Sequence, residues 1–125
     1  MKLLLDTHAL LWWLDDPNLL AEGARDAIAE PGNDVFVSSV VAWEIAIKRG
    51  LGKLTAPANL QEMLAECGFQ ELPISATHAL ATETLPFHHR DPFDRMLIAQ
   101  AISEQATLVS RDAVMDLYPV PVIPA

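Results

Sequence analysis

The sequence predicts an α/β domain in which a parallel sheet of about five strands is covered by helices on both faces. Short apolar runs alternate along the chain with segments that carry apolar residues at helical spacing, which is typical of βαβ units. Crossovers in such units are right-handed, and they place the helices on the faces of the sheet. The chain has 125 residues, the size of one domain, so we expect a single domain over residues 1–125.

The first unit joins a buried strand to a helix. Residues 2–5 form a short apolar run that ends at Asp6, and residues 8–14 continue as the start of a helix. The turn-forming residues 15–18 follow. A second helical pattern then covers residues 19–30, before a Pro-Gly-Asn sequence interrupts it.

The second unit again joins a strand to a helix. Residues 35–37 are predicted to form the strand, and a helix is expected from about residue 40 to residue 49. Ser38 or Ser39 can cap the N-terminus of this helix, and Gly50 is expected to end it.

The second half of the chain continues the alternation. We expect, in order, a helix, a short strand, a helix capped by Ser75, a helix opened by Asp91 and Pro92, a strand, a turn of helix and a last strand. Their ranges are 57–66, 69–74, 75–84, 91–104, 107–110, 113–117 and 120–123. The prolines in the last strand suit only the edge of a sheet.

The charge balance is acidic. Eight basic and 17 acidic residues give a formal net charge of −9, which opposes general attraction to a phosphate backbone. A nucleic-acid substrate therefore requires that some acids bind metal, or that the acidic surface attracts a basic partner segment.

A single cysteine, Cys67, excludes an internal disulfide and favours a reducing cytoplasm. The apolar runs are shorter than the roughly 20 residues of a membrane span, so we expect no membrane association.

Two acidic residues follow predicted strands directly. Asp6 comes after the first strand, and Asp112 comes after the strand at residues 107–110. The carboxyl ends of parallel strands form the edge on which ligands bind in open α/β sheets. Each residue alone could equally be a cap or turn residue, but their shared placement favours a site.

Glu44 is the one acid in the apolar segment of residues 40–47. A helix that is apolar nearly all round is expected to be buried on most sides, where an unpaired carboxylate is costly. Glu44 therefore needs a cation. The alternative is an exposed ion pair with Lys48, four residues further along the helix.

Two further acids open the helix at residues 91–104, and helix geometry separates them. Asp91 precedes Pro92, which is the usual arrangement of an N-cap followed by proline at the first helical position. Asp94 shares a face with Leu97 and Ile98, so we expect it to point inward. Metal binding is the favoured role for Asp94, and a capping box is the alternative.

Carboxylate oxygens are hard ligands that suit Mg²⁺ or Mn²⁺. One or two such ions would generate hydroxide from water and neutralise charge on a scissile phosphate, so no protein nucleophile is required. The sequence offers none, because Cys67 lies in no motif and no serine lies in a nucleophile elbow.

Four segments together resemble the acidic motifs of PIN-domain ribonucleases of the VapC type, the toxins of type II toxin–antitoxin pairs. They are residues 3–12, 38–48, 89–101 and 108–112, and the resemblance spans most of the chain. It implies a three-layer α/β/α PIN-like fold and an endoribonuclease that depends on Mg²⁺ or Mn²⁺ and blocks translation by hydrolysing RNA phosphodiester bonds. It also implies an antitoxin whose basic segment lies across the toxin, within a complex built on a homodimer.

By motif position, the family's acidic quartet corresponds to Asp6, Glu44, Asp94 and Asp112, as catalytic residues and metal ligands. Asp91 is a further, outer ligand or only a helix cap. Ser110 stands where the family more often has threonine, and we expect it to help place the substrate.

Because the net charge is negative, RNA must be held locally. His89, Arg90 and Arg95 lie beside Asp94 in the sequence and are the predicted phosphate contacts. A second basic cluster around Lys48 is more typical of ordinary surface charge. The tryptophans are expected in the core or in a partner interface rather than as base-stacking platforms.

Three other interpretations remain open. A phosphoacceptor receiver module has a similar length, but it would need paired acids after the first strand and a lysine after a late one, and no lysine follows Arg95. A PIN-like domain without catalysis would only bind a partner, although all four acids are present. A DNA nuclease would use the same metal chemistry.

Overall fold

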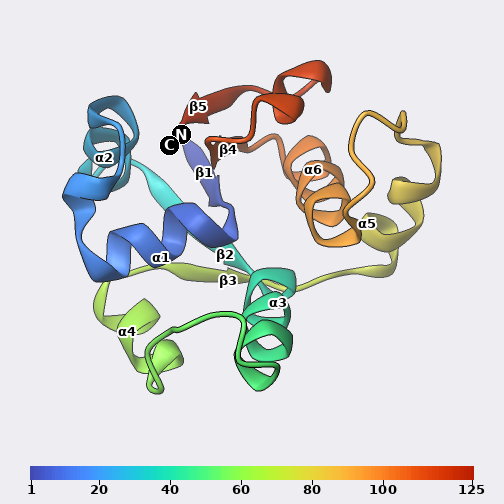
Figure 1. Cartoon of the computed structure of the whole chain (residues 1–125). Helices are drawn as coiled ribbons and strands as arrows, with labels where there is room; N and C mark the ends of the chain where they lie inside the picture. Colours follow the sequence, from blue (N-terminus) through green and yellow to red (C-terminus); the bar gives the residue numbers. More distant parts are fainter.

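The computed structural model describes residues 1–125 and contains five strands in one sheet, ordered β3-β2-β1-β4-β5 (Figure 1). Every pair of neighbouring strands is parallel. The strands are β1 (Lys2–Leu5), β2 (Asp34–Ser38), β3 (Gln70–Leu72), β4 (Thr107–Ser110) and β5 (Val122–Pro124). The predicted parallel sheet of about five strands is confirmed, and the proline-containing last strand lies at its edge, as expected.

Helices cover both faces of the sheet. They are α1 (Thr7–Asp15), α2 (Glu22–Ala29), α3 (Ser39–Gly50), α4 (Leu60–Glu66), α5 (Ala76–Ala81) and α6 (Pro92–Glu104), with short 3₁₀ helices η1 (Pro17–Leu19), η2 (Thr82–Thr84) and η3 (Ala113–Leu117). Figure 1 shows α1 and α2 on one side of the sheet and α5 and α6 on the other, so the three-layer arrangement is confirmed. Helix α3 contacts both α1 and α6. None of the helices has the length and apolar character needed to cross a membrane.

Strand β1 lies at the centre of the core. Leu3, Leu4 and Leu5 are fully buried, because β1 is paired on both edges and covered on both faces. In α6 the buried side chains include Leu97 and Ile98, which join the same hydrophobic cluster. The central strand and α6 are thereby fixed relative to each other.

The strand order determines where the candidate acids lie. Because β1, β2 and β4 are parallel neighbours, their carboxyl ends share one edge of the sheet. Asp6 follows β1, α3 begins directly after β2, and Asp112 lies two residues beyond β4. Three segments that are far apart in the sequence therefore meet at this edge.

Some element boundaries differ from the predicted ones. Gly50 is the last residue of α3 rather than its stop, and the reversal is made at Gly52, whose φ of 69° suits glycine. Helix α2 begins at Glu22 rather than at residue 19, because Leu19 ends η1 and the next two residues, Leu20 and Ala21, are extended. Helix α4 begins only at Leu60, so residues 57–59 lie outside it.

The expectation that α3 is buried on most sides is wrong. Val40, Val41 and Ile45 enter the core, but the opposite face of the helix is in solvent and Trp43 is 59% exposed. The outer face of α3 therefore gives no information about Glu44, which is itself only 7% exposed and whose placement depends on its own contacts.

Candidate metal centre

Asp6 sits at the junction of β1 and α1 and is only 7% exposed. Its carboxylate caps α1 by accepting a hydrogen bond of 2.8 Å from the Ala9 N–H. Burial raises the pKa of Asp6 above its ordinary value, hydrogen bonds from the Ser110 side chain and from Ala9 oppose this rise, and the charge of Glu44 adds to it. The residue is thus a helix cap and also part of a cluster of acids.

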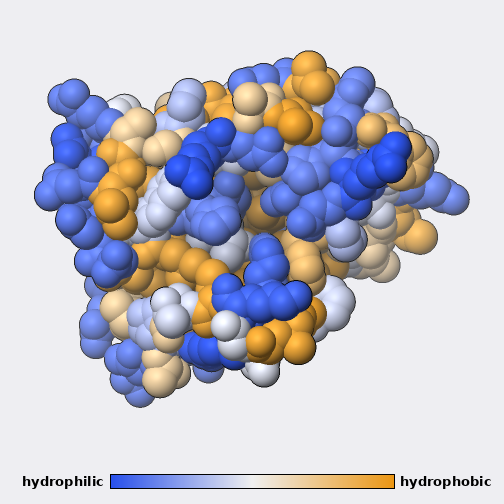
Figure 2. Space-filling view, viewed as in Figure 1, coloured by the Kyte–Doolittle hydropathy of each residue, from blue (hydrophilic) through white to orange (hydrophobic).

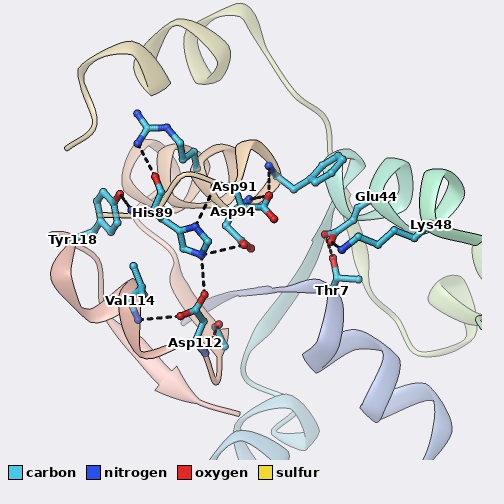
Figure 3. Close-up of polar contacts among 12 residues, drawn as sticks. Thr7, Glu44, Lys48, His89, Asp91, Asp94, Asp112, Val114 and Tyr118 are labelled. Atoms are coloured by element: carbon cyan, nitrogen blue, oxygen red, sulfur yellow. Dashed lines mark hydrogen bonds and ion pairs between the residues drawn. The ribbon is translucent and has the colours of Figure 1, made fainter. Parts of the chain in front are cut away.

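Glu44 projects from α3 towards the start of α1 and is 7% exposed. One carboxylate oxygen, Oε1, accepts a hydrogen bond of 2.6 Å from the Thr7 hydroxyl, and the other accepts from the Lys48 ammonium group (Figure 3). The hydrogen bond to Glu44 raises the pKa of Lys48, and the charges of Asp91 and Asp94 contribute further. The predicted pair with Lys48 exists, but its carboxylate is buried within the acidic cluster.

Asp91 and Asp94 both lie at the N-terminus of α6. Asp91 is the N-cap and accepts hydrogen bonds from the N–H groups of Phe93, at 2.8 Å, and Asp94, at 3.3 Å, so the predicted cap is confirmed. Burial raises the pKa of Asp94 to about 7, with further contributions from the charges of Asp91, Glu44 and Asp6, while His89 opposes the rise. The pKa of Asp94 thus depends on Asp91 in the same helix end and on the acids of two other segments.

Asp112 lies beyond β4 and caps η3. Its Oδ1 accepts a hydrogen bond of 3.0 Å from the Val114 N–H, and its Oδ2 accepts one of 2.7 Å from Nε2 of His89 (Figure 3). The same His89 nitrogen lies 3.2 Å from Oδ2 of Asp94. Burial acts to raise the pKa of Asp112, but the hydrogen bonds from Val114 and His89 together hold it below its ordinary value. His89 therefore connects the acids of α6 with the acid after β4.

The structure brings all four principal acids to one edge of the sheet. Figure 3 shows Glu44, Asp94 and Asp112 projecting from separate elements towards a common region, and the electrostatic interactions of Asp6 with Glu44 and Asp94 place it there too. Like charges this close repel, which disfavours their ionised forms until a cation separates them. Carboxylate oxygens from several elements are a donor set that fits Mg²⁺ or Mn²⁺.

The predicted RNA contacts divide into two groups. Arg90 is exposed, and His89 lies in the site itself. Arg95 is only 8% exposed and donates four hydrogen bonds to backbone carbonyls. Ser110 is 1% exposed, and its hydroxyl accepts from the Asp112 N–H. This geometry favours a positioning role over direct contact with RNA for Arg95 and Ser110.

Two residues of the site were not singled out from the sequence. Thr7 donates to Glu44, and the only signal for it is its position directly after Asp6. Tyr118 donates to one backbone carbonyl and accepts from the His89 N–H, 29 residues away in the sequence. No local pattern could have indicated that contact.

Acids that converge at the carboxyl end of a parallel sheet define this chain as an α/β protein with a candidate divalent-cation site. The chain belongs to the PIN-domain family, because the family model described as "PIN domain" matches residues 3–120.

Individual proteins are similar to this chain in sequence or in structure. Ribonuclease VapC22 of Mycobacterium tuberculosis is 28% identical over 116 residues, which cover 87% of this chain and 85% of that protein. The structure resembles that of VapBC2 from Rickettsia felis bound to a promoter DNA fragment, with a TM-score of 0.74, 18% identity, and coverage of 100% of this chain and 99% of that one. DNA-bound VapBC from Salmonella typhimurium matches with a TM-score of 0.71, 18% identity, and coverage of 99% and 98%. At this level of identity the structural likeness shows the fold.

Proposed function

We propose that this protein is a divalent-metal-dependent endoribonuclease that acts as the toxin of a toxin–antitoxin pair and inhibits translation by hydrolysing RNA phosphodiester bonds. The observation that carries this proposal is the convergence of Asp6, Glu44, Asp94 and Asp112 at one edge of the sheet in a PIN-domain chain. The similarity to a protein named Ribonuclease VapC22 supports RNA as the substrate.

The four acids would hold one or two Mg²⁺ or Mn²⁺ ions, with Asp91 as a further outer ligand. A bound ion would lower the pKa of the attacking water and neutralise charge on the scissile phosphate. The chain's own residues prepare this site. The Thr7 hydroxyl fixes Oε1 of Glu44, and the cap that Asp6 forms on α1 fixes the orientation of its carboxylate.

Substrate binding depends on a small number of cations near the acids. Arg90 is exposed next to His89 and Asp91, where its guanidinium group can bind a phosphate bidentately. His89 lies inside the site with Nε2 against Asp94 and Asp112, and the Ser110 side chain hydrogen-bonds Asp6. RNA would thus be held at the site itself rather than by an extended basic surface.

An antitoxin with a basic segment is the partner that the charge distribution favours. The net charge of −9 and the clustered acids would attract such a segment, and the two similar structures are VapBC complexes. Figure 2 shows apolar patches beside hydrophilic ones on the face viewed in Figure 1, and exposed apolar side chains include Trp43 and Leu51. We include a homodimer within the toxin–antitoxin complex, and a cytoplasmic location, in the proposal.

The decisive experiment replaces Asp6 by asparagine. Asparagine caps helices about as well as aspartate, so Asp6→Asn keeps the cap on α1 while it removes a metal-binding charge. We expect the purified variant to retain the thermal stability of the wild type and to lose metal-dependent cleavage of structured RNA. Assays with Mg²⁺, Mn²⁺ or a chelator, and with DNA in place of RNA, separate this activity from a DNA nuclease. Equal cleavage by the variant would remove Asp6 from the mechanism.

The biological role has its own test. Induction of the wild-type chain should slow bacterial growth, whereas Asp6→Asn should not, and co-expression of the small gene next to it should restore growth. Normal growth at high soluble expression of the wild type would contradict the toxin role without affecting the nuclease assignment.

A further inference from the structure

The His89 imidazole carries its proton on a defined nitrogen. Nδ1 lies 3.2 Å from the backbone nitrogen of Asp91 and accepts its N–H, so Nδ1 itself has no proton. The proton of the neutral ring is therefore on Nε2, where it is donated to Oδ2 of Asp112 at 2.7 Å, with Oδ2 of Asp94 at 3.2 Å.

This tautomer decides between two roles for His89. Nε2 and one oxygen from each of Asp94 and Asp112 lie within 4.8 Å of one another, a spacing that a metal site could use. A nitrogen that binds a metal must offer its lone pair, however, and the free lone pair of this ring is on Nδ1, where the Asp91 N–H occupies it. In this tautomer His89 donates a hydrogen bond to Asp112, lies beside Asp94, and offers no free lone pair to a metal.

Arg95 holds the segment that carries His89. Its guanidinium group donates to the carbonyl oxygens of Thr82 at 2.8 Å, Leu85 at 3.1 Å, Pro86 at 3.0 Å and His89 at 3.1 Å. The group is buried, and its carbon lies 4.3 Å from the centre of the exposed Phe87 ring. One side chain of α6 therefore hydrogen-bonds four carbonyls of η2 and of the loop that follows it.

Tyr118, which follows η3, contacts the same segment from a different element. Its hydroxyl donates to the Pro86 carbonyl at 2.6 Å and accepts from the His89 N–H at 2.8 Å. Tyr118 is 4% exposed, just beyond η3, which Asp112 caps. Arg95 and Tyr118 thus reach the two backbone polar groups of His89, and both also bind the Pro86 carbonyl.

We propose that Arg95 and Tyr118 are positioning residues that fix residues 82–89, so that the His89 imidazole donates to Asp112 beside Asp94 and stays outside the metal's ligand set. The expected effect on RNA cleavage rests on the proposed nuclease function, whereas the expected effect on the position of the His89 ring does not. Residues that orient the ligands of a metal typically contribute about 10-fold to 100-fold to affinity or activity.

Tyr118→Phe is the principal variant, because it removes the hydroxyl and keeps the buried ring. Arg95→Lys is the second, because a lysine keeps the charge but cannot donate to four carbonyls at once. Arg25→Met, on the surface of α2, is the control for loss of an arginine. The variants are compared by thermal denaturation, by RNA cleavage kinetics, and by long-range ¹H–¹⁵N NMR spectra of the histidine rings.

In the wild type we expect the NMR spectrum to show the His89 ring proton on Nε2 and none on Nδ1. In Tyr118→Phe we expect a shifted Nε2 resonance and kcat lowered about 10-fold, with KM changed less than kcat. Arg95→Lys should act in the same direction, and Arg25→Met should match the wild type. Unchanged His89 resonances and kcat in a folded Tyr118→Phe protein would overturn the proposal.

Pulsed EPR of the Mn²⁺-loaded protein tests the ligand set directly. We expect the wild-type spectrum to contain no hyperfine coupling from a nitrogen of His89 bound to the metal. A nitrogen coupling that is present in the wild type and absent in His89→Gln would show that His89 is a ligand. If the wild type binds Mn²⁺ but cleaves no RNA, the proposed function fails, whereas the NMR and EPR measurements still decide the role of His89.

Discussion

At the scale of single residues, Lys48 partly supplies the positive charge that the acids require. Its ammonium group contacts Glu44, and the charges of Asp91 and Asp94 also raise its pKa. We expect Lys48→Met to lower the free energy of unfolding of the metal-free protein by about 1 kcal/mol, a value kept small because solvent screens such a pair. The Lys48 side chain is 39% exposed. Urea denaturation with a chelator measures the loss, and Lys53→Met is the control. With saturating Mg²⁺ the difference should shrink, so an equal loss with and without metal would contradict this role.

The carboxyl group of Asp94 gives the metal-free protein a specific pH dependence. Its pKa is about 7 in the folded state, against an ordinary value of 3.8, so between these pH values the folded state holds a proton that the unfolded state has released. The stabilisation from this proton is complete below about pH 4 and is lost as the pH rises through about 7. We expect Asp94→Asn to flatten that decline in thermal stability, measured in the presence of a chelator. Asp26→Asn, an exposed acid on α2, should leave it unchanged, and an identical slope in Asp94→Asn would show that another group titrates.

The sequence predicted the residues of the site whose placement follows from the end of a strand or from helical spacing. Asp6 and Asp112 follow strands, and Asp94 lies one turn into a helix, so each position could be inferred locally. The hydrogen bond between Thr7 and Glu44 joins residues 37 positions apart, and it depends on how α1 packs against α3. Arg95 looked like a phosphate contact because charge is visible in a sequence, whereas its burial against loop carbonyls is not.

At the scale of elements, the N-terminus of α6 combines a structural role with a chemical one. Asp91 caps the helix, and its charge raises the pKa of Asp94. We expect Asp91→Ala to lower the free energy of unfolding by about 1 kcal/mol, and Asp91→Asn to change it by only a few tenths, because asparagine is an equally good cap. Denaturation of both variants checks this. Calorimetric titration of Asp91→Asn with Mn²⁺ then separates the two roles: unchanged affinity would leave Asp91 as a cap alone, and weaker affinity would support it as an outer ligand.

Elements whose borders carry strong capping signals were predicted with nearly correct bounds, and the others were not. The Asp91-Pro92 pair marks the start of α6 within one residue, and Ser38 marks that of α3. Helix α2 lacks a side chain that caps it, and the first residues of its predicted range are extended rather than helical, so its start could not be located. The surface exposure of Trp43 was also beyond prediction, because an apolar helix looks the same in a sequence whether or not its outer face is covered.

At the scale of the whole molecule, the net charge limits how RNA can be bound. Of the eight basic residues, Arg95 is buried and Lys48 is paired with Glu44. Arg111 packs its guanidinium group 4.4 Å from the centre of the Trp12 ring. Few cations therefore remain for phosphates near the acids. Affinity must come from the site and its bound metal rather than from counterion release over a broad surface.

This limit gives a quantitative expectation for the salt dependence of binding. Each phosphate neutralised on a single strand contributes about 0.7 to the slope of log K against log salt concentration, so two or three contacts give a slope of about −2 or shallower. The inactive Asp6→Asn protein and single-stranded RNA, titrated by fluorescence anisotropy at several NaCl concentrations, would measure it. Arg90→Gln should make the slope shallower by about 0.7, because one phosphate contact is lost. A slope steeper than about −4 would contradict this expectation, because it would require an extended basic surface, such as one completed by a second subunit.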